Sequence, residues 1–335
     1  MSDKPNRRAR RRRVLQVLAA LVVAWLVLDK TVSVAAPAPR VGHWRSQEGF
    51  ASYRAAYHEV MATLPAPTRT HDVATGYGAV RVYEWAAPGG GEGEDLPVVL
   101  LPGTRSGAPM WGDNLGHWIG ERTVYAMDAV GDAGMSTQSV PFASFDDQAT
   151  WVEQVLAGLD LARVHVVGHS FGGAVAATHS LRHPDRVASL TLLEPVMVLQ
   201  GLPASTYLWS TLLFLPGPQS WKDRALAEIG GVSVAEVRER TPMSVMIDKG
   251  AQHYAPVSLV PRTFTDEEWR SLPMPVRVDI AADKSLAGGG GAADRAGALG
   301  VDPVTVWPGT THSLPMQVAR ELGSELERYW SAHDR

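Results

Sequence analysis

The sequence predicts an α/β fold built on a mostly parallel sheet with helices on both of its faces. Two observations carry this prediction. Short, mainly apolar segments, such as residues 98–101 and 164–167, alternate with longer segments of helical spacing, which is typical of strands buried on both faces of a parallel sheet. In addition, residues 196–272 contain no clear strand and separate two of these segments, which indicates a helical insertion.

The first globular element is predicted to be a helix over residues 48–63, where apolar side chains fall near one face. Pro65 and Pro67 end this helix, because proline cannot continue the helical hydrogen bonding. Strands are predicted at 79–85 and 97–101. The acidic, glycine-rich sequence PGGGEGED between them is typical of a turn.

The alternation then continues to the end of the chain. The pattern predicts strands at 123–127, 164–167, 190–193, 275–281 and 303–307, and helices at 148–159, 172–181 and 314–330. With the two earlier strands, these segments give seven strands of a mostly parallel sheet covered by helices on both faces, and we expect the complete sheet to be eight-stranded.

The domain organisation follows from these segments. Residues 70–195 and 273–335 are predicted to form the α/β core, and residues 37–69 a spacer with an N-terminal helix. Residues 196–272 are predicted to be a helical cap over the carboxyl edge of the sheet, where ligands bind in open α/β sheets. The four glycines at 288–291 are interpreted as a flexible loop, since no Lys-Ser or Lys-Thr follows them as in a phosphate-binding loop.

The composition excludes several functions. The net charge is −4, so no long-range field favours a nucleic-acid partner. The chain has no cysteine, which excludes disulfides, thiolate metal sites and a cysteine nucleophile. Two pairs of histidines are spaced four apart, but neither has an acidic ligand at a fixed spacing. We therefore expect no metal and no cofactor.

The N-terminus carries an export or anchoring pattern in residues 1–36. Residues 7–13 read RRARRRR, and an apolar run follows over 14–28, interrupted by Gln16. Arginines remain on the cytoplasmic side while an apolar segment enters the bilayer. We expect a single N-terminal membrane anchor with the globular part outside the cytoplasm. The alternatives are secretion after cleavage near Ala36 and a cytoplasmic protein with a basic tail.

The sequence Gly168-His169-Ser170-Phe171-Gly172 is the strongest chemical motif of the chain. It fits the pattern G-x-S-x-G, with a predicted strand before it and a helix of small residues after it. In that context the serine occupies a sharp turn, and the glycines on either side allow close approach of the backbone. Ser170 is therefore predicted to be a catalytic nucleophile.

His312 is the predicted general base. It follows the last predicted strand in the segment GTTHSLP and precedes the last helix. A neutral imidazole at that place can take the serine proton and return it to a leaving group.

These motifs resemble those of the α/β-hydrolase superfamily, in particular its capped serine esterases, lipases and peroxidase-like members. The segment LLPGTRSGAPMW at 100–111 is similar to the family's His-Gly oxyanion loop, although Pro102 stands where the family usually has histidine. The segment YAMDAVGDAGMS at 125–136 resembles an Asp-x-x-Gly-x-Gly-x-Ser segment with one extra residue between its glycines. The resemblance implies that the backbone N–H groups of Thr104 and Phe171 form an oxyanion hole.

The acid of a Ser–His–acid triad has two candidates. The resemblance implies an acid either after the seventh strand, where Asp283 lies, or at the end of the sixth, where Glu194 lies. A carboxylate that ends an apolar strand is costly to bury without a partner, and a histidine would supply one. We predict Glu194 and keep Asp283 as the alternative.

These features predict a hydrolase of carboxylic esters or related acyl compounds, acting through an acyl-enzyme on a small apolar acyl substrate. A cofactor-free perhydrolase or a C–C hydrolase would use the same triad. An inactive binding protein on this fold is the alternative from another class.

Overall fold

The computed structural model describes residues 41–88, 95–203, 205–206, 208–209, 212, 218–257 and 259–334. The expected anchor or signal segment, residues 1–36, lies outside these residues. Residues Val41–Arg335 form one compact unit. Within the part of the chain that is described, no helix is long and apolar enough to cross a membrane.

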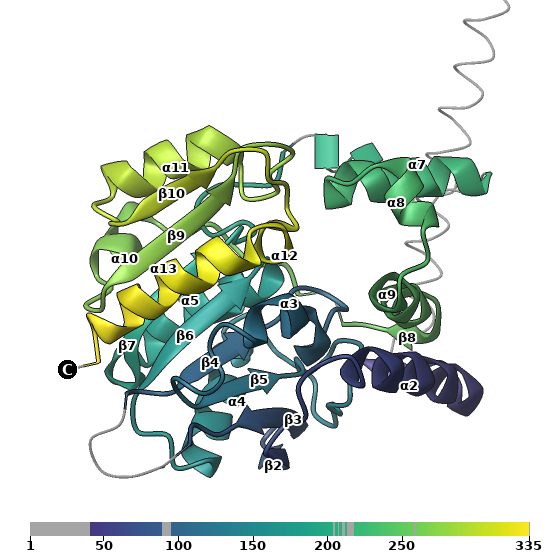
Figure 1. The fold of residues 1–335 in the computed structure, drawn as a ribbon, viewed down its shortest axis with the longest axis horizontal. Helices are drawn as coiled ribbons and strands as arrows, with labels where there is room; N and C mark the ends of the chain where they lie inside the picture. The colour runs from purple at the N-terminus through teal and green to yellow at the C-terminus, as the bar shows by residue number, and fades with distance from the viewer. Residues whose placement is uncertain are drawn as a thin grey trace, which may run out of the picture. The chain divides into compact units, whose positions relative to one another are not determined.

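The core is an eight-stranded sheet in the order β10-β9-β7-β6-β4-β5-β3-β2 (Figure 1). Its strands are β2 (Arg69–Thr75), β3 (Gly78–Trp85), β4 (Val98–Leu101), β5 (Val124–Met127), β6 (Val164–His169), β7 (Val187–Leu193), β9 (Val276–Ala281) and β10 (Val304–Trp307). All neighbouring strands are parallel except where β3 pairs with β2 and with β5. The predicted eight-stranded, mostly parallel sheet is confirmed.

Helices cover both faces of this sheet, and each face has its own apolar cluster. On β4, Val99 and Leu101 join one cluster while Val98 and Leu100 join the other, because successive side chains of a strand point to opposite faces. The first cluster includes side chains of α4 (Asp147–Gly158), α5 (Phe171–Arg182) and α11 (Gly289–Ala298). The second includes side chains of α13 (Ala319–Ser331) and of the segment that contains η1 (Ala108–Trp111) and α3 (Gly112–Leu115).

Three elements of the sheet and of the helices that cover it differ from the sequence-based expectation. The edge strand β2 was not predicted, because its sequence RTHDVAT is mostly exposed and has no apolar run. The four glycines at 288–291 were interpreted as a loop, yet Gly289–Ala298 is helix α11 because Ala292 and Ala296 pack into the core. The helix expected over 314–330 is divided into α12 (Leu314–Gln317) and α13 at Val318.

The regular structure in the described part of the insertion, residues 196–272, is mainly helical. It contains α7 (Gln219–Gly230), α8 (Val234–Arg238), α9 (Pro242–His253) and α10 (Asp266–Arg270). Ser233, Thr241 and Thr265 cap three of these helices by accepting a backbone N–H in the first turn. The insertion also contains the two-residue strand β8 (Tyr254–Ala255), which the sequence pattern did not reveal.

The N-terminal helix α2 (Gln47–Met61) packs against α9 of the insertion (Figure 1). The strand β1 (His43–Trp44) pairs with β8 in an antiparallel ladder just before this helix. Tyr53 and Tyr57 of α2 are fully buried. The residues expected to be a spacer and a helix therefore hold one side of the insertion in place.

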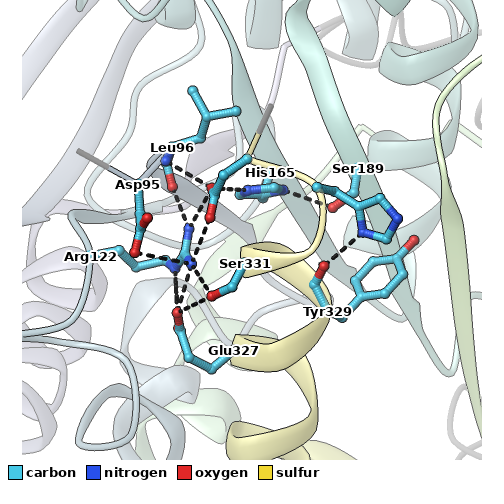
Figure 2. Close-up of polar contacts among 10 residues, drawn as sticks. Asp95, Leu96, Arg122, His165, Ser189, Glu327, Tyr329 and Ser331 are labelled. Carbon is cyan, nitrogen blue, oxygen red and sulfur yellow. Dashed lines mark hydrogen bonds and ion pairs between the residues drawn. The ribbon is translucent and has the colours of Figure 1, made fainter. Parts of the chain in front are cut away.

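The C-terminus is tied to the sheet by a polar cluster, called here the C-terminal latch, in which Glu327 and the partly buried Asp334 contact the buried Arg122 and His165. Figure 2 shows Arg122, His165 and Glu327 of this cluster. The Asp334 carboxylate accepts hydrogen bonds from His165 Nε2 (2.9 Å) and Arg122 Nη1 (3.1 Å). Arg122 Nη2 also lies 2.6 Å from Glu327 Oε1. Because His165 is near the start of β6, the latch lies at the amino ends of the strands.

Candidate active site

Ser170 lies in the sharp turn between β6 and α5, with φ 55° and ψ −119°. Few non-glycine residues adopt a positive φ, and they are often found at functional sites. The flanking glycines make the turn possible. A Cβ at Gly168 would lie 2.3 Å from the Gly172 carbonyl oxygen, and a Cβ at Gly172 would lie 2.2 Å from the Leu101 carbonyl oxygen. The spacing G-x-S-x-G is therefore a steric requirement of this turn.

His312 meets Ser170 from the loop between β10 and α12. Its Nε2 lies 2.8 Å from Ser170 Oγ, although 142 residues separate the two in the chain. The loop is held by its neighbours, because Thr310 Oγ1 donates to the Trp307 carbonyl and Thr311 N donates to Gln317. The imidazole is thus placed to receive the serine proton.

Glu194 directly follows β7, with φ 49° and a fully buried side chain. Its Oε2 lies 3.0 Å from His312 Nδ1. Burial raises the pKa of this carboxyl. Hydrogen bonds from His312, Ser285 and Ala281 lower the pKa by more than burial raises it, so the net pKa is below the usual value. Glu194 is therefore ionised at neutral pH and can stabilise a positive charge on the imidazole.

The side chain of Asp283, the alternative acid, is not hydrogen-bonded to His312. Its side chain is exposed and makes no hydrogen bond or ion pair within the described part of the chain, while its backbone N–H donates to the Thr310 carbonyl. The loop after β9 instead supplies donors to Glu194, through Ser285 Oγ (2.7 Å) and Leu286 N (3.0 Å). The structure brings together Ser170, His312 and Glu194 and leaves Asp283 outside.

The two expected oxyanion donors, Thr104 and Phe171, border the same cavity as Ser170 and His312. Neither backbone N–H donates a hydrogen bond to any residue that the structure describes. Gly103 allows the loop after β4, which carries Thr104, to approach Ser170 closely, because a Cβ at Gly103 would lie 3.3 Å from Ser170 Cβ. The Phe171 N–H belongs to the first turn of α5, at the positive end of the helix dipole.

The cavity beside Ser170 has a volume of about 1020 Å³. Most of its lining is apolar and comes from the core, from α2 and from the insertion, including Leu64, Met110, Val196, Leu226, Met243 and Ile247. Arg105, Asp132 and Gln148 are among its polar residues. In the described residues, no group of three or more histidine or acidic side chains is arranged to hold a metal ion.

His169 has a positioning contact that the sequence pattern did not reveal. Its Nε2 lies 2.9 Å from the His312 carbonyl oxygen, and its ring is buried. Burial lowers the pKa of His169 to about 3, with a further contribution from His312, so the ring is neutral and Nε2 donates. The residue directly before the serine therefore holds the His312 loop, and no signal beyond the motif itself pointed to this contact.

The fold and this arrangement define the class of protein. The chain has the α/β-hydrolase fold, and a family model described as alpha/beta hydrolase fold matches residues 97–225. The strand order and the strand–serine–helix turn are consistent with this match.

Similar proteins are known from Bacillus subtilis. The chain is 24% identical over 283 residues to the uncharacterized carboxylesterase nap, covering 84% of this chain and 92% of that protein. It is 24% identical to the carboxylesterase YbfK, covering 69% and 76% of the two chains. The crystal structure of naproxen esterase from the same organism superimposes with a TM-score of 0.75 at 22% identity, covering 85% of this chain and 99% of that one. At this identity the structural likeness concerns the fold.

Proposed function

We propose that this protein is a serine hydrolase that cleaves carboxylic esters, with Ser170, His312 and Glu194 as its catalytic triad. The continuous hydrogen-bonded line from Ser170 Oγ through the His312 ring to Glu194 Oε2 carries this proposal. The similarity to carboxylesterases supports an acyl ester as substrate.

In the proposed reaction, His312 Nε2 takes the proton of Ser170 Oγ as this oxygen attacks the ester carbonyl carbon. The N–H groups of Thr104 and Phe171 stabilise the negative oxygen of the tetrahedral intermediate. His312 then gives the proton to the leaving alcohol oxygen, and the acyl group remains on Ser170. Water attacks this acyl-enzyme, with His312 again taking and returning the proton. Glu194 holds the Nδ1 proton of His312 and stabilises the imidazolium.

The insertion acts as a cap in this proposal, because its side chains line the cavity beside Ser170. An apolar lining favours uncharged acyl groups, since burial of apolar surface stabilises binding and burial of an unpaired charge opposes it. We therefore infer a small, apolar acyl substrate.

We also propose that residues 1–36 anchor the protein in the cell membrane with the hydrolase domain outside the cytoplasm. The basic block at 7–13 and the apolar run at 14–28 support this location. Expression of the full chain, followed by fractionation and mass measurement of the product, tests it. A soluble extracellular form that begins near Pro37 would show secretion after cleavage, and a full-length cytosolic form would exclude export.

The catalytic proposal is tested with a fluorophosphonate probe and a series of p-nitrophenyl esters of increasing chain length. The wild type should be labelled and should turn over esters without added peroxide. Ser170→Ala should lose labelling and at least about 10⁴-fold in kcat. Unlabelled wild-type protein would instead support a binding role, and turnover that requires peroxide would support a perhydrolase.

A further inference from the structure

Two loops meet behind the candidate oxyanion hole. The loop after β4 carries Thr104, whose N–H is one of the expected donors. The loop after β5 runs from Asp128 to Ser136 and has one residue more than the family segment it resembles, between Gly131 and Gly134. Asp132 lies in this longer stretch, half-buried in the wall of the cavity.

Asp132 joins the two loops. Its Oδ2 accepts a hydrogen bond from the Arg105 N–H at 2.6 Å, and its Oδ1 accepts one from Ala133 N at 2.8 Å. Burial raises the pKa of the Asp132 carboxyl, and the hydrogen bonds from Arg105 and Ala133 offset only part of this rise. An ionised carboxylate at this place therefore costs folding free energy. This cost indicates that Asp132 has a role other than stabilising the fold.

The bond to Arg105 acts on a constrained part of the oxyanion loop. Arg105 has φ 62°, a left-handed conformation that non-glycine residues rarely adopt. Two other contacts fix the ends of this loop: Ser106 Oγ donates to the Gly103 carbonyl, and Ala108 N donates to Asp128 Oδ1 at 2.7 Å. Within the turn that the first contact closes, Asp132 holds the peptide that follows Thr104.

The geometry points to Asp132 as a positioning residue, whose carboxylate holds the Arg105 N–H and thereby aims the neighbouring Thr104 N–H at the substrate oxyanion. The N–H groups of Thr104 and Arg105 belong to consecutive peptide planes, so fixing the second restricts the first. An oxyanion donor is effective only when it lies about 2.7–3.1 Å from the developing charge. This inference rests on the proposed function and adds the residue that pre-organises its oxyanion hole.

The test compares Asp132→Ala and Asp132→Asn with wild-type protein, using a short-chain p-nitrophenyl ester below the lowest melting temperature of the set. Asp132→Ala should lower kcat by about 10²-fold, comparable to the loss of one oxyanion donor, with KM within about threefold of wild type. Asp132→Asn keeps a side-chain carbonyl that can accept the Arg105 N–H. It should therefore recover at least about tenfold of this loss.

A second readout isolates the oxyanion hole. An aliphatic trifluoromethyl ketone adds to the serine and forms an oxyanion in the hole. Asp132→Ala should weaken its inhibition by about the same factor as it lowers kcat. If Asp132→Ala does not fold, Asp132→Asn takes its place. The factor by which Asp132→Asn lowers kcat should then match the factor by which it weakens ketone inhibition.

Asp147→Ala is the matched control. The Asp147 carboxylate also accepts two backbone N–H groups, those of Ala143 and Ser144, but it does not line the cavity. This variant should keep kcat within about twofold of wild type. The inference is overturned if Asp132→Ala keeps kcat within about threefold, or if kcat falls while ketone inhibition is unchanged. Activity that survives Ser170→Ala would overturn the proposed function instead.

Discussion

Glu194 Oε2 lies 3.0 Å from His312 Nδ1, although 118 residues separate them in the chain. The same carboxylate accepts hydrogen bonds from Ala281 N and from Ser285 Oγ. Glu194 thus joins the ends of β7 and β9 to the loop that carries His312. The carboxylate is fixed from several directions and leaves the imidazole one orientation, with Nε2 toward Ser170.

Glu194→Gln should lower kcat by about 10⁴-fold, because the neutral amide neither stabilises an imidazolium nor enforces the Nδ1–H tautomer. Ester hydrolysis by the purified protein measures this effect. The matched control is Asp283→Asn, which removes the exposed carboxylate and should stay within about twofold of wild type. Equal losses in the two variants would contradict the assignment of Glu194.

Gly172→Ala should destabilise the protein by at least about 3 kcal/mol or prevent folding, because the added Cβ would lie 2.2 Å from a backbone oxygen. Thermal unfolding measures the change. Gly297→Ala on α11 is the control, because the added Cβ would have no atom within 4 Å apart from its chain neighbours and the backbone of its own helix. It should raise stability by about 0.5–1 kcal/mol. A tolerated Gly172→Ala would show that the elbow relaxes more easily than its contacts indicate.

Stability should fall as the pH is lowered from about 6.5 toward 4. Burial lowers the pKa of His165 to about 4 and that of His169 to about 3, whereas an unfolded histidine titrates near 6.5. The unfolded chain therefore binds protons in this range that the folded protein does not. The stability conferred by the neutral rings is present above about pH 6.5 and is lost as the pH falls through the folded pKa values.

Melting temperatures measured between pH 7 and pH 5 test this prediction. The wild type should lose several degrees, equivalent to about 2 kcal/mol for each buried histidine at pH 5. His165→Gln removes one of the two groups and should show a smaller loss over the same range. The same pH dependence in both proteins would exclude His165 as a cause.

Asp334→Ala should destabilise the fold without changing the chemistry. It removes the acceptor for His165 Nε2 and Leu96 N and one partner of the fully buried Arg122 side chain. We expect a loss of about 2–4 kcal/mol. Because the latch lies at the amino ends of the strands, kcat well below the melting temperature should remain within about twofold of wild type. Denaturant unfolding and ester hydrolysis measure the two effects.

Glu321→Ala is the control for this prediction, because Glu321 is an exposed residue on the same helix, α13. It should change stability by no more than about 0.5 kcal/mol. A loss as large as that of Asp334→Ala would mean that the latch contributes nothing particular to stability.

The sequence alone determined the parallel α/β core, the elbow around Ser170 and the place of His312 after the last strand. Each depends on residues adjacent in the chain: short apolar strands, glycines two positions before and after a serine, a histidine between a strand and a helix. The edge strand β2 and helix α11 were not predicted. An exposed strand such as β2 has no apolar run, and the glycine-rich first turn of α11 is stabilised by the alanines of the same helix that pack into the core.

Only the tertiary structure decided between Glu194 and Asp283 as the partner of His312, joined α2 to the insertion, and placed Asp132 against Arg105. Each of these relationships joins segments that are remote in the sequence. A local pattern records which groups a segment exposes or buries. It does not record which of two carboxylates at the same edge of a sheet reaches an imidazole, because that depends on the turn that follows each strand and on the donors that surround it.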